Sequence, residues 1–546
     1  MIPTRLRPVL AVFALAATLA PAGCGDPGQG SAAAGDWDVL IRGGTVVDGT
    51  GEPGYTADVA LRGDRIVRVS REGLDPTGAT TVVDATGMVV APGFVDLHVH
   101  LNTLGDHPGA ESHVRQGVTT ALGGPDGGGP WPFGEALAEV EAMGVGMNVG
   151  YLAGHNTIRE AVMGMDDRAP TPEELARMTG MVAQAMDEGA WGISTGLKYL
   201  PGAFSDVDEV VALSVEAAEA GGIYTSHLRE EGLGLLEGVS EAIEIGRRAG
   251  IPVVLTHHTV VGLPMWGAST TTLAMVDSAR ATGVDVMIDQ YPYTASYTGI
   301  DILVPAWAMG GGEDAFFDRL EDPVLADSIL EGIAFNIVND RGGNDLDRIQ
   351  FALVSWDRSL EGRTLGDWAR DRGLEPTPAT GARLVVEAIR NGGTRNVFFA
   401  MDEGDVDAIM AHPMTMIASD GRLTAPGIGH PHPRWYGTFP RVLGEYVRER
   451  GVLDLETAVH KMTSMPARRM GLGERGEVRE GWFADLVVFD PETVTDRATF
   501  EEPHQYPDGI PWVFVNGVAQ VEDGAFMDRR PGRVLRKGVS VDEGSP

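Results

Sequence analysis

The sequence predicts an α/β protein whose central part is a barrel of alternating strands and helices. Short Val/Ile-rich runs alternate with helix-like stretches through the middle of the chain, β-like segments lie at both ends, and histidines follow the ends of several predicted strands. Repeated βα units form either a barrel or a doubly wound sheet. The histidines favour the barrel, because the carboxyl ends of its strands converge on one mouth.

The first residues have the pattern of an export signal. Arg5 and Arg7 precede an apolar run over 9–17 that is too short to span a bilayer as a mature helix. Cys24, the only cysteine, follows in a segment that resembles the lipobox of bacterial lipoproteins. We therefore expect an exported protein, a periplasmic or cell-envelope lipoprotein attached to the membrane through lipidated Cys24, with a soluble secreted protein as the alternative. A lone cysteine excludes an internal disulfide and a Cys-rich metal site.

Charge narrows the range of partners. The 546 residues carry a formal net charge of -36, which argues against nucleic acid or an anionic membrane surface because both attract basic faces. The charge does not identify a substrate.

Both ends of the ordered chain read as short strands and hairpins. Val/Ile-rich runs separated by Gly and Asp turns occupy 38–91, and the same pattern returns at 484–490 and 512–517. The predicted organisation is a signal peptide over 1–23, a flexible tether over 24–36, a β domain split between 37–91 and 473–530, a barrel over 92–472 and a tail over 531–546.

One βαβ unit is especially clear. Residues 222–227 and 252–257 read as strands, and the helix between them has apolar residues at core-facing spacing from Leu235 to Ile245. Such a crossover makes the two strands parallel. Ser205 and Asp208 predict a capping box for the preceding helix.

Histidines and one aspartate mark the ends of predicted strands. His98 and His100 lie two apart in a strand-like run, so they point the same way and suit zinc or a similar ion. His227 and His257 end two further strands, and Asp420 ends the run over 415–419. Buried imidazoles need polar partners, and a shared metal would satisfy them together. Taken alone, Asp420 would be read as a turn or cap residue.

The order of the motifs resembles the amidohydrolase superfamily, and more closely its N-acyl-D-amino-acid deacylase (D-aminoacylase-like) family. The resemblance rests on these segments: APGFVDLHVH at 91–100, QGVTT at 116–120, GISTGL at 192–197, YTSHLR at 224–229, THH at 256–258, YPYTA at 291–295, SDG at 419–421 and HPR at 432–434. It implies a TIM-like (β/α)8 barrel flanked by a small β-sandwich built from both chain ends. It also implies one or two Zn2+ ions, with four histidines as ligands and Asp420 as the acid/base group. Those histidines are His98, His100, His227 and His257.

The group that bridges the metals departs from the family pattern. Many relatives place a cysteine shortly after the Gly-Val-Thr-Thr strand, where this chain has Asp126. Other superfamily members use a lysine carboxylated by carbon dioxide near the end of the fourth strand, and Lys198 lies near such a place. We expect carboxylated Lys198 to be the bridge, with Asp126 as the alternative; an unmodified surface lysine is the third reading.

Substrate recognition is less clearly defined. Some D-aminoacylases carry a substrate-binding lysine where this chain has Thr259. Arg229, Tyr291 and Arg434 are candidates to hold a carboxylate or carbonyl, although arginines near helix ends are often structural.

The expected function is metal-dependent hydrolysis of the amide bond of N-acyl (D-)amino acids or related small amides by metal-activated water. The alternatives are a cyclic amidase or dipeptidase on the same scaffold, or a lipid-anchored, non-catalytic metal- or solute-binding protein. A pure binder has no need of Asp420 opposite the metal.

Overall fold

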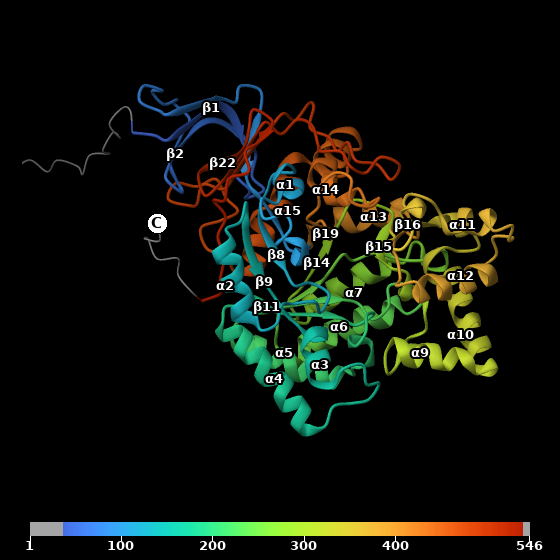
Figure 1. The fold of residues 1–546 in the computed structure, drawn as a ribbon. Coiled ribbons are helices and arrows are strands. Elements are labelled where there is room, and N and C mark those ends of the chain that lie inside the picture. The colour runs from blue at the N-terminus through green and yellow to red at the C-terminus, as the bar shows by residue number, and fades with distance from the viewer. Residues whose placement is uncertain (1–35, 539–546) are drawn as a thin grey trace, which may run out of the picture.

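A computed structural model describes residues 36–538 (Figure 1). The predicted signal peptide, Cys24 and all of the tether but its last residue lie outside the described residues, as do residues 539–546 of the predicted tail. Among the described residues, no helix combines the length and the apolar character that crossing a membrane requires.

The centre of the described chain is a parallel barrel, as predicted. Two runs of hydrogen-bonded strands, β6-β8-β9 and β10-β11-β12-β13-β14-β18, follow the order of the sequence. These strands are β6 (Phe94–Asp96), β8 (Val118–Gly123), β9 (Asn148–Tyr151), β10 (Ala153–Gly154), β11 (Gly192–Gly196), β12 (Ile223–His227), β13 (Val253–Leu255), β14 (Val286–Gln290) and β18 (Thr415–Ile417). They are almost wholly buried, as expected for strands covered on both faces.

The barrel closes between its last and first strands through polar contacts. Two short strands, β7 (Val99–His100) and β19 (Gly421–Arg422), pair in parallel beyond β6 and β18. The Ser419 backbone N–H also donates to Asp96 Oδ1 at 3.0 Å. The loops after the first and last strands are thereby held side by side.

Helices cover the outside of the barrel (Figure 1). They are α1 (Glu111–Val114), α2 (Phe133–Met143), α3 (His155–Met163), α4 (Pro172–Asp187), α5 (Val207–Glu219), α6 (Leu235–Ala249), α7 (Ser269–Ala281), α13 (Glu403–Ala411), α14 (Arg434–Arg441), α15 (Leu455–Met462) and α16 (Ser464–Met470). Single turns and π-helical segments join them: η1 (Leu101–Thr103), η2 (Gly202–Phe204), η3 (Leu263–Met265) and η8 (Val442–Glu449).

The clearest predicted unit is confirmed, and one predicted cap is wrong. Strand β12, helix α6 and strand β13 form the parallel crossover. Helix α5, however, is capped by Asp206, whose side chain accepts a hydrogen bond from the Glu209 N–H at 2.9 Å. Ser205 instead donates to the Gly202 carbonyl at 2.7 Å.

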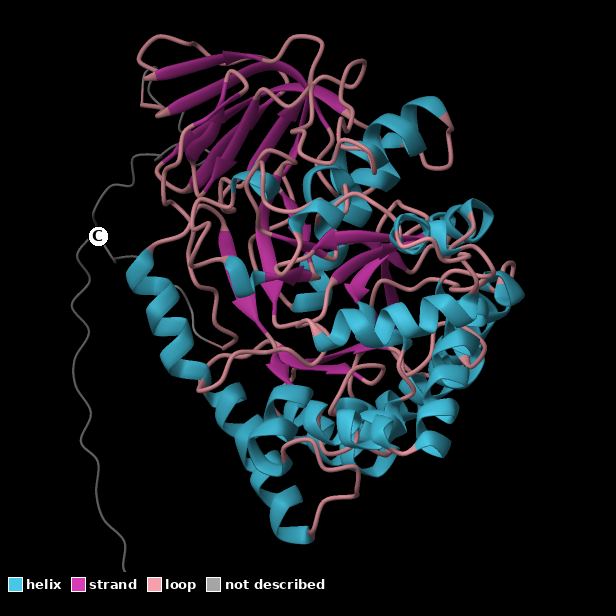
Figure 2. Cartoon of the chain, turned by 45° about the vertical axis from the view of Figure 1, so that its right-hand side comes forward, coloured by secondary structure: helices cyan, strands magenta, loops and turns pink. Residues whose placement is uncertain are grey.

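The two ends of the described chain build one β domain, seen at the top of Figure 2. Its strands are β1 (Val39–Val46), β2 (Tyr55–Arg62), β3 (Arg65–Ser70), β4 (Thr81–Asp84), β5 (Val89–Pro92), β20 (Leu486–Phe489), β21 (Trp512–Val515), β22 (Val518–Glu522) and β23 (Ala525–Phe526). Strand β20 pairs with β5, so N- and C-terminal segments share one sheet. Ile41, Leu61, Leu486 and Phe514 belong to one buried cluster inside it. Residues 533–535, assigned to the tail by the sequence, bond to Val149 of β9.

Between β14 and β18 the chain leaves the barrel and forms an insertion, at the right of Figure 1. It contains β15 (Ser296–Gly299), η4 (Ile300–Leu303), α8 (Ala306–Met309), α9 (Glu313–Glu321), α10 (Pro323–Asn336), η5 (Ile337–Arg341), η6 (Leu346–Arg348), β16 (Ile349–Leu353), η7 (Arg358–Leu360), α11 (Leu365–Asp371), α12 (Pro378–Arg390) and β17 (Arg395–Phe398). Phe316, Phe351 and Phe398 lie in its own apolar cluster. The sequence analysis did not separate this unit from the barrel.

Candidate metal centre and active site

Asp126 lies at the centre of the four predicted histidines. It belongs to the loop after β8, and its Oδ1 lies 3.4 Å from His98 Nε2, 3.5 Å from His257 Nε2 and 3.9 Å from His227 Nδ1. Its other oxygen, Oδ2, lies 3.5 Å from His100 Nε2. The strand ends therefore bring these side chains together as the barrel prediction required.

Asp420 faces the same group from the end of β18. Its Oδ1 lies 3.1 Å from His100 Nε2 and 3.5 Å from His98 Nε2. Two overlapping clusters result, each close enough for its members to share an ion. The first contains His98, His100, Asp126 and Asp420, and the second contains Asp126, His227 and His257. Asp126 is common to both, which is the position of a bridging ligand.

Several polar atoms of this group have no hydrogen-bond partner among the described residues. They include His98 Nε2 and Asp126 Oδ1, both buried. Buried polar atoms nearly always have a hydrogen-bond partner, so several unpartnered atoms gathered in one place indicate a ligand site. Imidazole nitrogens and carboxylate oxygens are donors that zinc accepts. The residues present therefore fit a divalent metal.

The charges of the group also favour a cation. Burial alone would raise the pKa of Asp126, but His98 and His257 hold it well below the ordinary value. Burial likewise opposes protonation of His257, yet Asp126 and Glu231 raise its pKa well above the usual range. The carboxylates thus stabilise positive charge between the rings, which a dication would supply in place of protons.

The backbone at three of these residues is unusual for non-glycine residues. Asp126, His257 and Asp420 have φ values of 54°, 35° and 47°. Left-handed conformations carry a steric cost and persist where surrounding contacts enforce them, often at functional sites. Their occurrence at three members of one cluster marks the strand ends as a site rather than ordinary turns.

The loop that carries Asp126 is held from β11 and α3. Ser194 Oγ donates to the Gly124 carbonyl at 2.6 Å and accepts from the Gly127 N–H at 3.1 Å. A Cβ at Gly196 would collide with the Asp126 carbonyl oxygen. Asn156, on α3, donates to the Gly196 carbonyl at 2.9 Å. The Gly-Ile-Ser-Thr-Gly motif therefore serves to position Asp126.

Glu231 is a site residue that the sequence analysis missed. Its Oε1 lies 3.2 Å from His257 Nδ1, and its Oε2 lies 3.6 Å from His227 Nε2 and 3.0 Å from Arg341 Nη2. A carboxylate on the far nitrogen of a ligating imidazole fixes its tautomer and orientation. The only sequence signal was its place four residues after His227. Arg341 comes from η5, so the insertion supports the centre.

Arg434 and Tyr291 line the same site from the other side. Arg434 Nη2 pairs with Asp420 Oδ2 at 2.9 Å, and its guanidinium lies 4.5 Å from the centre of the Tyr291 ring. Its Nε and Nη1 have no hydrogen-bond partner among the described residues. Burial would raise the pKa of Asp420, but Arg434 lowers it below the ordinary value. His432 accepts the Arg434 backbone N–H at 3.0 Å, which explains the His-Pro-Arg motif.

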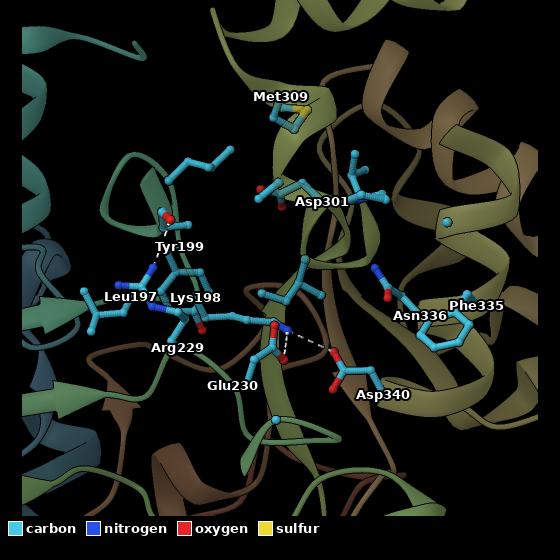
Figure 3. Close-up of a pocket in the computed structure, with 18 of the residues that line it drawn as sticks. Leu197, Lys198, Tyr199, Arg229, Glu230, Asp301, Met309, Phe335, Asn336 and Asp340 are labelled. Carbon is cyan, nitrogen blue, oxygen red and sulfur yellow. Dashed lines mark hydrogen bonds and ion pairs between the residues drawn. The ribbon is translucent and has the colours of Figure 1, made fainter. Parts of the chain in front are cut away.

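The structure corrects the preference for Lys198. Its ammonium lies 2.7 Å from Glu230 Oε2 and 3.4 Å from Asp340 Oδ2, in a separate cavity of about 850 Å³ (Figure 3). Burial opposes its charge, but Asp340 and Glu230 raise its pKa. A carbamate forms from the neutral amine and would place a third anion beside two carboxylates. The structure therefore brings Asp126, and not Lys198, among the histidines.

Arg229 and His258 are near neighbours in the chain of predicted ligands. Arg229, a candidate for substrate binding, forms an ion pair with Glu241 at 2.9 Å and donates to the carbonyls of Ala203 and Ser205. His258 bonds to Thr272 Oγ1 at 2.9 Å and lies outside both clusters. His257 is thus the member of the His-His pair that faces the site.

A cavity of about 300 Å³ opens onto the clusters. His100, Asp126 and Asp420 form its inner wall. Tyr199, whose ring centre lies 4.4 Å from that of His227, lines both this cavity and the larger one in Figure 3. The sequence analysis did not single out Tyr199. A small molecule entering here meets His100, Asp126 and Asp420.

Comparison with known proteins agrees with this arrangement. The model of the amidohydrolase family matches residues 81–284 and 344–520. The chain belongs to the amidohydrolase family. The match is interrupted over 285–343, which contain β14 and the first part of the insertion. It resumes at 344, within the insertion, and continues through β18.

Individual relatives of this amidohydrolase span nearly the whole chain. D-aminoacylase of Alcaligenes xylosoxydans xylosoxydans is 37% identical over 92% of this chain and 98% of its own length. N-acyl-D-glutamate deacylase of the same organism is 38% identical over 92% and 97%. The crystal structure of N-acyl-D-glutamate deacylase from Bordetella bronchiseptica, complexed with zinc and a phosphonate mimic of the tetrahedral intermediate, superposes with a TM-score of 0.77. It is 36% identical and covers 92% of this chain and 100% of its own.

Proposed function

We propose that this amidohydrolase removes the acyl group from N-acyl-D-amino acids by metal-dependent hydrolysis of the amide bond. One observation carries the proposal: Asp126 joins two histidine clusters at the mouth of a cavity that also holds Asp420. The relatives act on N-acyl-D-amino acids, and one of them binds zinc with a mimic of amide hydrolysis.

Zinc is the cofactor, and the site would hold one or two Zn2+ ions. His98, His100 and Asp420 would hold one position, His227 and His257 the other, and Asp126 both. When bound, the ion lowers the pKa of a water molecule and polarises the substrate carbonyl.

The chain's own groups supply proton transfer and orientation. Asp420 is kept ionised by Arg434, so its Oδ1 can accept a proton from water and pass it to the leaving amine. Arg434 has free donors beside Tyr291, which suit the α-carboxylate of the amino acid. The hydroxyl of Tyr291 stays protonated, because burial raises its pKa to about 12.

The test is turnover of matched substrates by the zinc-loaded protein. N-acetyl-D-amino acids should release acetate faster than their L enantiomers, a D-dipeptide or a cyclic amide. Faster turnover of the dipeptide or the cyclic amide would assign the scaffold to that activity instead. Zinc binding without turnover of any substrate would make the protein a binder.

We also propose that the protein is exported and anchored through lipidated Cys24. The support is the sequence alone: a basic start, an apolar run over 9–17 and a cysteine directly after it. Labelling with a fatty-acid probe should modify the wild type and not Cys24→Ala. Equal extraction of both proteins in the soluble fraction would favour the secreted form.

A further inference from the structure

Two arginines line the catalytic cavity together with members of the metal group. Arg422 belongs to β19 and pairs in register with His100. Arg395 is the first residue of β17 in the insertion. Both line the cavity of about 300 Å³ together with Asp126 and Asp420. Barrel and insertion thus each contribute one guanidinium to the same small space.

Neither guanidinium forms an ion pair with a carboxylate within residues 36–538. Other buried arginines do: Arg341 pairs with Glu231, and Arg434 pairs with Asp420. The chain holds 78 acidic residues against 42 basic ones, so a shortage of carboxylates is not the reason. Arg422 is half-buried, and an enclosed guanidinium without a carboxylate is costly unless a ligand completes it. Arg395 is exposed and can turn toward such a ligand without that cost.

The surroundings of Arg422 reinforce this reading. The side-chain oxygen of Asn102, in the orientation that satisfies its neighbours, accepts from Arg422 Nη1 at 3.2 Å, which leaves other donors open. An anion in the cavity would give both guanidinium groups a charged hydrogen-bond partner.

We propose that Arg395 and Arg422 form a second anion subsite, which binds a carboxylate of the substrate other than its α-carboxylate. This inference rests on the proposed deacylase function, in which Arg434 holds the α-carboxylate. The preferred substrate is then an N-acyl-D-amino acid with an additional acidic group. That group belongs either to the amino-acid side chain or to the acyl chain. Glu160 also lines the cavity but is exposed, so water screens its charge.

Three substrates separate these sources. N-acetyl-D-alanine carries only the α-carboxylate, N-acetyl-D-glutamate adds a carboxylate on the amino acid, and N-succinyl-D-alanine adds one on the acyl group. Arg395→Gln with Arg422→Gln should raise the KM for one of the acidic substrates at least about tenfold, the expected loss of a charge-assisted hydrogen bond. The kcat/KM for N-acetyl-D-alanine should stay within about twofold of wild type.

Two further variants keep the test decisive. Arg383→Gln removes an exposed arginine of α12 that lines neither cavity, and it should leave all three substrates unaffected. Arg395→Gln alone removes an exposed side chain and tests the subsite even if the Arg422 variant fails to fold. Unchanged KM for both acidic substrates, or an equal loss for N-acetyl-D-alanine, would overturn the proposal.

Binding to the zinc-loaded protein distinguishes failure of the subsite from failure of the proposed function. Calorimetry should find glutarate bound more tightly than butyrate by wild type, and the double variant should lose that preference. Glutarate preference without turnover of any N-acyl amino acid would keep the anion subsite and reject the deacylase activity. Turnover without glutarate preference would reject the subsite.

Discussion

The two halves of the metal group differ in how they are supported. His227 and His257 are each 4% exposed and lie against Glu231, which is itself tied to Arg341. His100 is 23% exposed and, with Asp420, faces the cavity. The inner half, His227 and His257, is buried and supported by the Glu231 carboxylate. The outer half, which includes His100 and Asp420, lines the cavity that a substrate would enter. From this difference we expect the inner half to hold metal more firmly and the outer half to take part in the reaction.

The largest effect should come from removing the group that both halves share. Asp126→Ala takes away the one carboxylate that both clusters share. Loss of metal affinity should exceed the roughly 10–100-fold typical for a residue that only orients a ligand. Elemental analysis after dialysis, together with turnover, measures this. Full metal retention would show that another residue forms the bridge.

Asp420→Asn should affect the outer half of the metal group and leave the inner half unchanged. We expect turnover to fall by about 10²–10⁴-fold, the usual range for loss of a general acid or base. Metal in the inner half should remain, because Asp420 has no place in the cluster of His227 and His257. Metal content and turnover are measured on the same sample. Loss of all metal would make Asp420 chiefly a ligand of the whole centre.

Glu231→Gln tests the support of the inner half. The amide keeps the size of the side chain and removes the charge that fixes the far nitrogens of His227 and His257. Metal affinity should fall about 10–100-fold. Glu230→Gln is the matched control, since this neighbour pairs with Lys198 and has a side chain 45% exposed. A chelator titration compares the two variants, and equal affinities would remove Glu231 from this role.

The same contrast explains which parts of the site could be predicted from sequence. Histidines at the ends of apolar strands were visible because both the period and the residue type are local signals. Glu231 and Arg341 meet only after the insertion folds back on the barrel, and no local pattern pairs residues 110 apart. Asp126 was recognised as a candidate, but its advantage over Lys198 depends on the Ser194 and Gly196 contacts that hold its loop.

The fold shows a similar limit. Alternating runs predicted the barrel, and β-rich ends predicted the flanking domain, since both are periodic over many residues. The insertion escaped notice because its helices and strands have the same local periodicities as barrel elements. What separates it is pairing: β15 and β16 both join β17 antiparallel, which strand propensity does not encode.

Lys198→Ala should have the smallest effect, and it tests the assignment of the bridge most directly. The variant removes an ammonium whose partners are Glu230, with a side chain 45% exposed, and Asp340, which is mostly buried. Water screens the first pair, and Arg341 Nε also lies 3.5 Å from Asp340 Oδ2. We therefore expect a stability loss of about 1 kcal/mol, chiefly from removing one of the two cations beside Asp340. Thermal unfolding measures that loss.

Metal content and kcat of Lys198→Ala should stay near wild type, because the ammonium lies in the second cavity and outside both clusters. Added short-chain carboxylic acids should therefore change neither the metal content nor the activity of this variant. If Lys198→Ala instead loses one metal and most activity, and acetate or propionate partly recovers both, then a carboxylated lysine reaches the centre and the bridge does not belong to Asp126.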